Sequence, residues 1–206
     1  MPDTRVFVAD ANSTDGTAEM ARSFPAKFAI EVIPGGLPAV GRNAGARRAT
    51  TPYVLFLDAD VELRDPTLLR RSVCAMQRRQ LHCLTTNIRC IDGGAADRLL
   101  YCASNLVQKA SRWAAPFATG MFMMFDRQEF QKLSGFNEQA LYAEDYLLSK
   151  QVARRRFAVI PGEAMTSNRR FQKMGRLRIA GMFFRTALNS GNKNYFLRDQ
   201  GYWEEF

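Results

Sequence analysis

The sequence has little of the chemistry that triad hydrolases and zinc proteins need. His82 is its one histidine and no Gly-x-Ser-x-Gly segment occurs, so a Ser-His-Asp triad would depend on that residue alone. No apolar run approaches the length of a transmembrane helix, and no signal peptide is visible. Four cysteines match no zinc-ligand spacing, and we expect them to be free, buried thiols in a reducing cytoplasm: Cys74, Cys83, Cys90 and Cys102.

Composition predicts one globular domain with an uneven charge. The 206 residues suffice for one sizeable core and are too few for two ordinary domains. Residues 150–206 hold 12 Lys and Arg against 4 Asp and Glu, a net charge of +8 within a total of +9. No basic stripe with interleaved aromatics and no known binding motif accompanies this charge, so we expect no nucleic-acid partner.

An apolar run, Tyr53-Val-Leu-Phe-Leu57, ends abruptly in Asp58 and Asp60. The run predicts a strand buried on both faces in a parallel sheet, where ligands bind at the carboxyl ends of the strands. Two carboxylates at such an end are suited to a hard divalent cation, Mg²⁺ or Mn²⁺. The alternative is that the two acids cap the helix that follows.

The segments before this run show the same pattern, an apolar strand that ends at an acid. A strand over 6–9 ends at Asp10 and is followed by a polar turn, which includes Asn12 and Ser13, and by a helix over about 16–23. A second strand is predicted at 28–33 and a helix at 40–49. Strands that alternate with helices predict an α/β fold, a mostly parallel Rossmann-like central sheet flanked by helices.

Six motifs in this order carry a family resemblance. The front ones are Asp10-Ala-Asn-Ser-Thr-Asp-Gly-Thr17, Gly41-Arg-Asn-Ala-Gly45 and Phe56-Leu-Asp-Ala-Asp60. The back ones run through Thr119–Arg127 and Gly135–Glu138 to Ala143-Glu-Asp-Tyr-Leu-Leu148. Together they closely resemble family 2 glycosyltransferases, which have the A-type nucleotide-diphospho-sugar transferase fold. The resemblance implies a catalytic domain over 1–175, with 176–206 a basic helix and tail of the same domain.

The resemblance implies a metal-dependent, hexosyltransferase-like enzyme that moves a sugar from a UDP- or GDP-sugar with inversion. Asp60 would bind Mn²⁺ or Mg²⁺, and Asp58 would hold the ribose or assist the metal. Asp10, with Asn12 and Ser13, would contact the nucleotide. Arg42 and Asn43 would line the same pocket, although Arg42 could equally lie on a helix surface.

Asp145 would be the base that takes the acceptor's proton, because it matches the second residue of the family's Glu-Asp pair. Glu144 beside it would raise its pKa or orient it. The alternative is an acid-rich helix start, which the helix dipole favours. We expect this helix to run from near Glu144 to Arg154-Arg-Arg156.

Thr166-Ser-Asn-Arg-Arg-Phe171 stands where many relatives carry Gln-x-x-Arg-Trp. Ser167 and Phe171 depart from that pattern, which suits shorter, non-processive relatives. Arg169 and Arg170 can still bind diphosphate oxygens through charge-assisted hydrogen bonds. A solvated basic loop is the alternative.

The resemblance also implies that a strand is missing at the amino terminus of this sequence. Family members normally begin with a strand and a Pro-x-x-Asn-Glu-like turn before the Asp10 strand, whereas this sequence starts just ahead of it. We therefore expect an inner strand to be absent, with unpaired backbone groups on its two neighbours. The alternative function is accordingly a truncated or non-catalytic member that acts as a binding module.

The basic segment 176–188 predicts an amphipathic helix with Leu177, Ala180, Phe184 and Leu188 on one face. Such a helix can lie on an anionic membrane, which would suit a lipid-linked or cell-envelope acceptor and a location at the inner face of the membrane. The alternative is a helix packed on the domain with a solvated basic face. The tail over 190–206 would fold back or pack on a second copy in a homodimer.

Overall fold

The computed structural model describes residues 4–198, apart from the side chain of Lys193. Its strands are β1 (Arg5–Asp10), β2 (Ala29–Pro34), β3 (Tyr53–Leu57), β4 (Cys83–Cys90), β5 (Phe122–Asp126) and β6 (Phe157–Thr166). Helices separate most of them: α1 (Thr17–Ser23), α2 (Pro38–Arg48), α3 (Leu68–Arg79), α4 (Ala95–Ala110), α5 (Arg127–Lys132) and α6 (Glu144–Ser149). After β6 come α7 (Arg169–Met174), α8 (Arg176–Leu188) and α9 (Lys193–Phe196). Two short 3₁₀ helices are η1 (Ser111–Trp113) and η2 (Arg154–Arg156).

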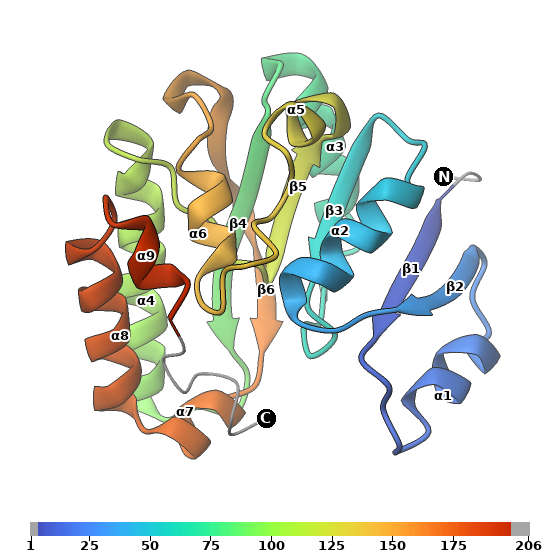
Figure 1. The fold of residues 1–206 in the computed structure, drawn as a ribbon, viewed down its shortest axis with the longest axis horizontal. Helices are drawn as coiled ribbons and strands as arrows, with labels where there is room; N and C mark the ends of the chain where they lie inside the picture. The colour runs from blue at the N-terminus through green and yellow to red at the C-terminus, as the bar shows by residue number, and fades with distance from the viewer. Residues whose placement is uncertain (1–3, 199–206) are drawn as a thin grey trace.

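The strands form two sheets. β1 pairs with β2 in parallel, and the larger sheet has the order β3-β5-β4-β6. β4 and β6 are parallel, and β5 runs antiparallel to both of its neighbours. In Figure 1 the β1–β2 pair continues the line of the larger sheet beyond β3. The predicted α/β architecture is confirmed, and β5 makes the larger sheet mixed, because two of the three strand pairs in that sheet are antiparallel.

β1 and β3 belong to different sheets, and the predicted missing inner strand would lie between them. Among the described residues, β1 forms ladder pairs with β2 only, and β3 with β5 only. Each strand therefore has a free edge of backbone donors and acceptors, as expected if one strand were missing between them.

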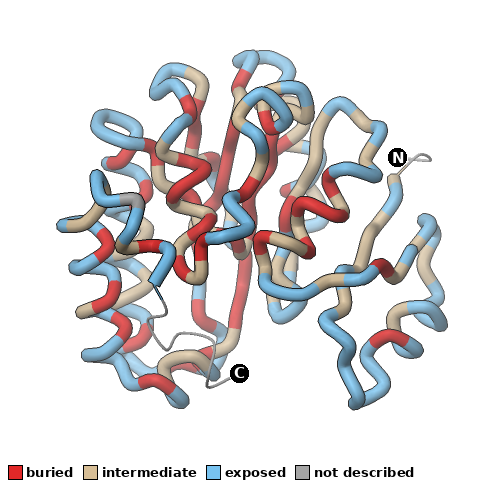
Figure 2. The backbone as a smooth tube through the Cα atoms, in the orientation of Figure 1, coloured by how far each residue is buried: buried red, intermediate tan, exposed pale blue. Residues whose placement is uncertain are grey.

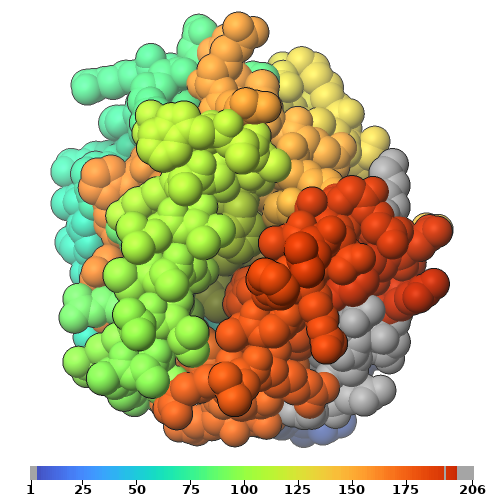
Figure 3. All heavy atoms as spheres, turned by 90° about the vertical axis from the view of Figure 1, so that its left-hand side faces the viewer, coloured from blue at the N-terminus to red at the C-terminus, as the bar shows by residue number. Residues whose placement is uncertain are grey.

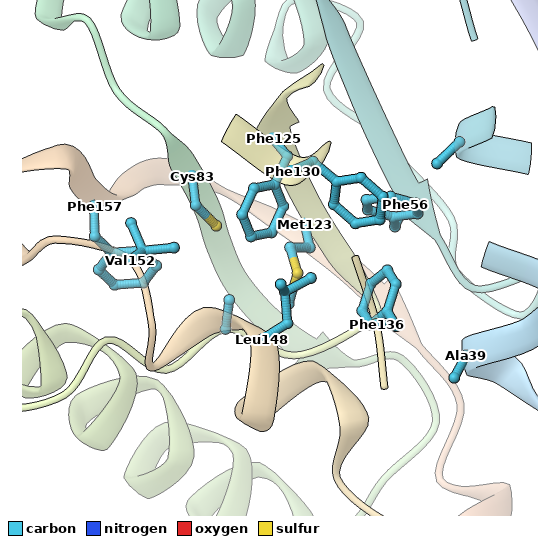
Figure 4. Packing of buried hydrophobic residues seen from close by; sticks show 12 residues of the cluster. Ala39, Phe56, Cys83, Met123, Phe125, Phe130, Phe136, Leu148, Val152 and Phe157 are labelled. Carbon is cyan, nitrogen blue, oxygen red and sulfur yellow. The ribbon is translucent and has the colours of Figure 1, made fainter. Parts of the chain in front are cut away.

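The core lies on both faces of the larger sheet. Side chains alternate along each strand, so Phe56, Met123 and Phe125 face one cluster, while Phe122 and Met124 face the other. The first cluster is closed by side chains from α2, α5, α6 and the loops beside them (Figure 4). Figure 2 shows that burial concentrates along this sheet and is sparse around β1, β2 and α1.

Position in the sheet explains one departure from the sequence prediction. β3 has the predicted bounds, and both of its faces contact a core cluster. Only Phe56 in it is fully buried, and Leu57 is exposed. A strand beside the gap between the sheets lacks a neighbour on that side, so water reaches most of its side chains.

Helix α2 packs closely on β1 because of a glycine. A Cβ atom on Gly41 would lie 2.9 Å from the Cβ of Ala9, inside ordinary contact distance. The close approach holds α2 against the first sheet and directs its next residues toward the end of β3.

The helix after Glu144 is shorter than predicted. α6 ends at Ser149, and Arg154–Arg156 form the separate turn η2 that leads into β6. Val152 between them is buried in the core, and β6 begins at Phe157 in register with Cys83. A continuous helix could not place both residues there, so the chain turns.

The segment after β6 folds back on the domain as far as it is described. Ile179, Met182 and Thr186 of α8 are buried against it, and Phe196 of α9 is fully buried in the same cluster. The predicted tail residues 199–206 lie outside the described part. None of the helices within 4–198 combines the length and apolar character needed to cross a bilayer.

Candidate active site

The predicted acids follow β3, but neither caps a helix. The next helix, α3, begins only at Leu68. Neither acid is its N-cap residue, which is Thr67, and no side-chain hydrogen bond caps this helix. Asp58 Oδ1 accepts a hydrogen bond from Arg42 Nη2 at 2.6 Å. Asp60 Oδ2 lies 3.8 Å from Arg169 Nη2. The capping alternative is therefore wrong.

Arg42 is the centre of the cluster. Its side chain is 15% exposed, and it forms ion pairs with Asp58 and with Glu144. Its guanidinium also lies 5.4 Å from the ring centre of Phe136. Burial opposes its charge, yet the two carboxylates outweigh burial and raise the pKa of Arg42. The helix-surface alternative for Arg42 is wrong.

The predicted base is held by backbone donors. Asp145 Oδ2 accepts from the Gly120 N–H at 2.8 Å, and Oδ1 accepts from the Tyr146 N–H at 2.7 Å. Both carboxylate oxygens of Asp145 are therefore fixed in direction. Because α6 begins at Glu144, the acid-rich helix start that the sequence offered as an alternative is also present.

The two neighbouring acids have raised pKa values. Burial, followed by the charge of Asp145, raises the pKa of Glu144 to about 7 against the opposing effect of Arg42. Burial likewise raises the pKa of Asp145, with Arg42 again opposing. One guanidinium thus faces three carboxylates, those of Asp58, Glu144 and Asp145, in largely buried surroundings. Such a cluster favours keeping a proton on the Glu144–Asp145 pair near neutral pH.

Gly120 is the residue that the sequence prediction missed. A Cβ atom there would collide with the Arg42 guanidinium, and its N–H orients Asp145. The only signal for it in the sequence was its place in the quoted Thr119–Arg127 motif.

Asn43 lies beside Arg42 but contacts a different segment. Its amide donates to the Phe136 carbonyl at 2.8 Å and to Glu138 at 2.9 Å, and its oxygen accepts from the Phe136 N–H at 3.0 Å. These bonds tie the loop before α6 to α2. The predicted nucleotide contact of Asn43 stays a prediction.

The predicted nucleotide residues near β1 form an exposed turn. Asp10 Oδ2 accepts from the Ser13 N–H at 3.2 Å, and Asn12 has a left-handed φ of 64°. In Figure 1 the strands β1, β3, β4 and β6 all run toward the lower side of the molecule, so their carboxyl ends point the same way. No described contact joins the turn to the Arg42 cluster.

Arg169 and Arg170 begin α7, directly after β6. Arg169 is exposed and approaches Asp60, and Arg170 is partly buried. Phe171, at the position of the family's Trp, packs edge-on against Tyr101 with ring centres 5.2 Å apart. The segment is helical, so the solvated-loop alternative is wrong about its conformation, whereas the exposure of Arg169 agrees with it.

The four cysteines differ in burial. Cys83 and Cys90 are buried free thiols as expected, whereas Cys74 is half-buried and Cys102 is exposed. Within residues 4–198 no cluster of three or more His, Cys, Asp or Glu side chains could hold a metal ion. A cation at Asp60 would therefore take other ligands from substrate oxygens and water, which is common for Mg²⁺.

Comparison with known proteins agrees with this geometry. Residues 1–134 match the family described as Glycosyl transferase family 2. Uncharacterized glycosyltransferases of Mycobacterium bovis and Mycobacterium tuberculosis are 46% identical over 56 residues, which is 27% of this chain and 25% of theirs.

Two solved structures share the fold. A mannosyltransferase, PcManGT from Pyrobaculum calidifontis in complex with GDP-Man and Mn²⁺, superposes with a TM-score of 0.65 at 20% identity, covering 89% of this chain and 55% of that one. S. aureus TarS 1-349 gives 0.58 at 17% identity, covering 94% and 60%. This chain thus spans little more than half of either structure. Its fold is the A-type glycosyltransferase fold, and the chain belongs to glycosyltransferase family 2.

Proposed function

We propose that this protein transfers a sugar, with inversion, from a nucleotide-diphosphate donor to an acceptor hydroxyl in a reaction that depends on a divalent cation. The observation that carries the proposal is the Arg42 cluster. Arg42 links Asp58, at the end of β3, to Glu144, at the start of α6. The front acids and the back acids of the family motifs therefore meet at one buried cation.

Asp60 is the proposed ligand of Mn²⁺ or Mg²⁺, with Asp58 assisting it or holding the ribose. Carboxylate oxygens suit these hard ions, and Asp60 is accessible, with 41% of its side chain exposed. The nearby guanidinium of Arg169 shows that this carboxylate already attracts a positive group. When bound, the cation supplies positive charge to the leaving diphosphate.

The remaining donor contacts are proposed from the edge of the sheet. Asp10, Asn12 and Ser13 would contact the nucleotide, and Arg42 with Asn43 would form the inner wall of its pocket. Arg169 and Arg170 would hold diphosphate oxygens, since α7 starts beside Asp60. In this arrangement Arg169 exchanges its contact with Asp60 for one with the diphosphate.

Asp145 is the proposed base. Its oxygens are held by two backbone N–H groups, and its raised pKa suits a carboxylate that must accept a proton near neutral pH. In the proposed step, one oxygen takes the acceptor hydroxyl proton as the acceptor oxygen bonds to the anomeric carbon, and the bond between that carbon and the diphosphate oxygen breaks. Glu144 is a positioning residue, because it fixes Arg42 next to Asp145.

The donor and the acceptor are proposed by chemical class. The GDP-Man and Mn²⁺ in the PcManGT complex support a nucleotide hexose and a divalent ion for this chain too, and UDP is the other candidate nucleotide. We propose a lipid-linked or envelope glycan as acceptor, reached from the cytoplasmic side.

The cation assignment is tested by thermal shift with UDP and with GDP, in the presence and absence of Mn²⁺. We expect a Mn²⁺-dependent rise in the melting temperature with one nucleotide, and its loss in Asp60→Ala. Glu62→Ala is the matched control, because it removes one exposed carboxylate from the same loop. An unchanged shift in Asp60→Ala would refute the metal assignment.

A binding module without catalysis is the second candidate, and the divided sheet favours it. The free edges of β1 and β3 lie beside the proposed nucleotide site, where an enzyme needs a rigid wall. The same thermal shift separates the two functions: no response to either nucleotide, together with no transfer, would favour the binding module.

A further inference from the structure

Helix α4 has its polar and apolar faces reversed. The side chains of Asp97 and Gln108 are buried, and Gln108 donates to the Thr86 carbonyl of β4 at 2.8 Å. On the solvent side Leu99 is 70% exposed, and Leu106 and Val107 are also exposed. The wheel of a helix places these three with Cys102, Ala103 and Ala110 on one apolar stripe.

Helix α8 is apolar on both sides. Ile179, Met182 and Thr186 pack on the domain, as described above. The opposite side carries the stripe predicted from the sequence, and it faces solvent: Leu177 is 90% exposed, Leu188 70% and Phe184 65%. The helix is packed on the domain as the alternative expected, and its solvated side carries this apolar stripe together with the exposed Arg178 and Arg185.

The two stripes belong to one surface of the molecule. Arg176, the first residue of α8, donates to Asp97 in the first turn of α4 at 2.6 Å. Figure 3 shows α4 in green and α8 in orange-red next to each other on the face that it presents. Trp113, just after α4, is also exposed. We name this surface, formed by α4, η1 and α8, the α4–α8 face.

Charge on the α4–α8 face has a single sign. Asp97 is the only acid in 95–113 and 176–188, and it is fully buried against Arg176. Exposed cations flank the stripes: Arg98, Lys109, Arg112, Arg176, Arg178 and Arg185. The Arg112 guanidinium lies over the Trp113 ring at 4.7 Å.

We propose that the α4–α8 face docks on the surface of an anionic lipid bilayer. Exposed apolar stripes of this kind mark an interaction site. The partner must cover this apolar surface, and because the exposed charges of the face are all positive, the partner should carry negative charge. A bilayer with acidic head groups offers an apolar layer and negative charge together, and it accommodates Trp and Phe at the boundary. A second copy fits less well, because the same cations would meet across a two-fold axis.

Flotation of the 206-residue chain with vesicles tests the proposal. The probes are vesicles of phosphatidylcholine alone and vesicles with an equal amount of phosphatidylglycerol added. We expect binding to the acidic vesicles only, weakened by salt. Neither donor nor cation is needed, so failure of this test would leave the proposed transferase reaction unaffected.

Two variant pairs separate the apolar and the electrostatic contributions. Leu177→Gln with Phe184→Gln keeps the charge and removes apolar surface, and we expect binding to fall by more than about ten-fold. Arg98→Gln with Arg185→Gln removes charge only, and at about five-fold per cation it should weaken binding by more than about ten-fold. Met20→Gln, an exposed apolar residue of α1, is the matched control and should bind normally. Far-UV circular dichroism and the melting temperature check that each variant folds.

Three results would overturn the proposal. Equal binding to neutral and acidic vesicles would remove the electrostatic argument. Unchanged binding in the Leu177/Phe184 pair would place the lipid contact elsewhere. A dimer in sedimentation without lipid that dissociates in the same pair would show that a second copy covers the α4–α8 face.

Discussion

At the scale of single residues, Arg42 decides the electrostatics of the site. It is a largely buried cation between carboxylates that come from opposite halves of the sequence. Breaking a buried pair leaves an uncompensated charge, which typically costs about 3–5 kcal/mol. The surrounding acids therefore act as one unit, and a change at any of them alters the protonation of the others.

The role of Asp145 is testable by one substitution. In Asp145→Asn we expect sugar transfer to fall by about 10²–10⁴-fold, since general base catalysis contributes on this order. Nucleotide binding, measured by the Mn²⁺-dependent thermal shift, should be retained, because the proposed donor contacts lie on other residues.

Glu163→Gln is the matched control for Asp145→Asn, because it removes an exposed carboxylate of β6 that pairs only with Arg89 among the described contacts. Transfer by Asp145→Asn at close to the original rate would mean that another group takes the proton.

At the scale of elements, the site depends on close packing between segments that are distant in sequence. α2 reaches the end of β3 because Gly41 allows it to approach β1. The loop before β5 comes close to Arg42 because Gly120 has no side chain. Asn43 then ties the loop before α6 to α2 with three hydrogen bonds. The side chains of the cluster are placed by these contacts rather than by any single helix or strand.

Gly120→Ala tests this placement. The added methyl group would push the Arg42 guanidinium away from Asp58 and Glu144, and overpacking of this kind costs about 1–3 kcal/mol. We expect a lower free energy of unfolding in urea and a loss of transfer.

Gly181→Ala is the matched control, because no atom lies within 4 Å of a Cβ placed there. It should raise helix stability by about 0.5–1 kcal/mol. Equal stability of Gly120→Ala and the original protein would show that Arg42 can move without cost.

At the scale of the whole molecule, the cluster predicts how stability depends on pH. The pKa of Glu144 is about 7 in the folded state against an ordinary value of 4.5. Between these values the folded protein binds the proton more tightly than the unfolded chain, so the free energy of unfolding falls as the pH rises. For this group alone the fall amounts to at most about 3 kcal/mol between pH 4.5 and 7.

Urea unfolding across this pH range measures the effect. Glu144→Gln cannot titrate at this position, so its stability should depend less on pH over the same range. A stability that stays flat or rises in the original protein, with no difference from Glu144→Gln, would contradict a proton held by the pair.

Most of the fold could be predicted from the sequence, because it rests on local patterns. Apolar runs with acids at their ends gave β1 and β3, and the alternation with helices gave the α/β class. The prediction was weaker for features that depend on contacts with other strands or with the core. The exposure of β3 follows from the gap beside it, and the early end of α6 follows from the burial of Val152 and Phe157.

The sequence by itself determined which side chains can do chemistry and roughly where each lies along a strand or helix, because residue type and spacing are local properties. Only the tertiary structure decided that Arg42 is buried between Asp58 and Glu144, that Gly120 makes room for it, and that α8 turns Leu177 to solvent. Pairing and burial depend on which surfaces meet across many intervening residues, and no local pattern contains that information.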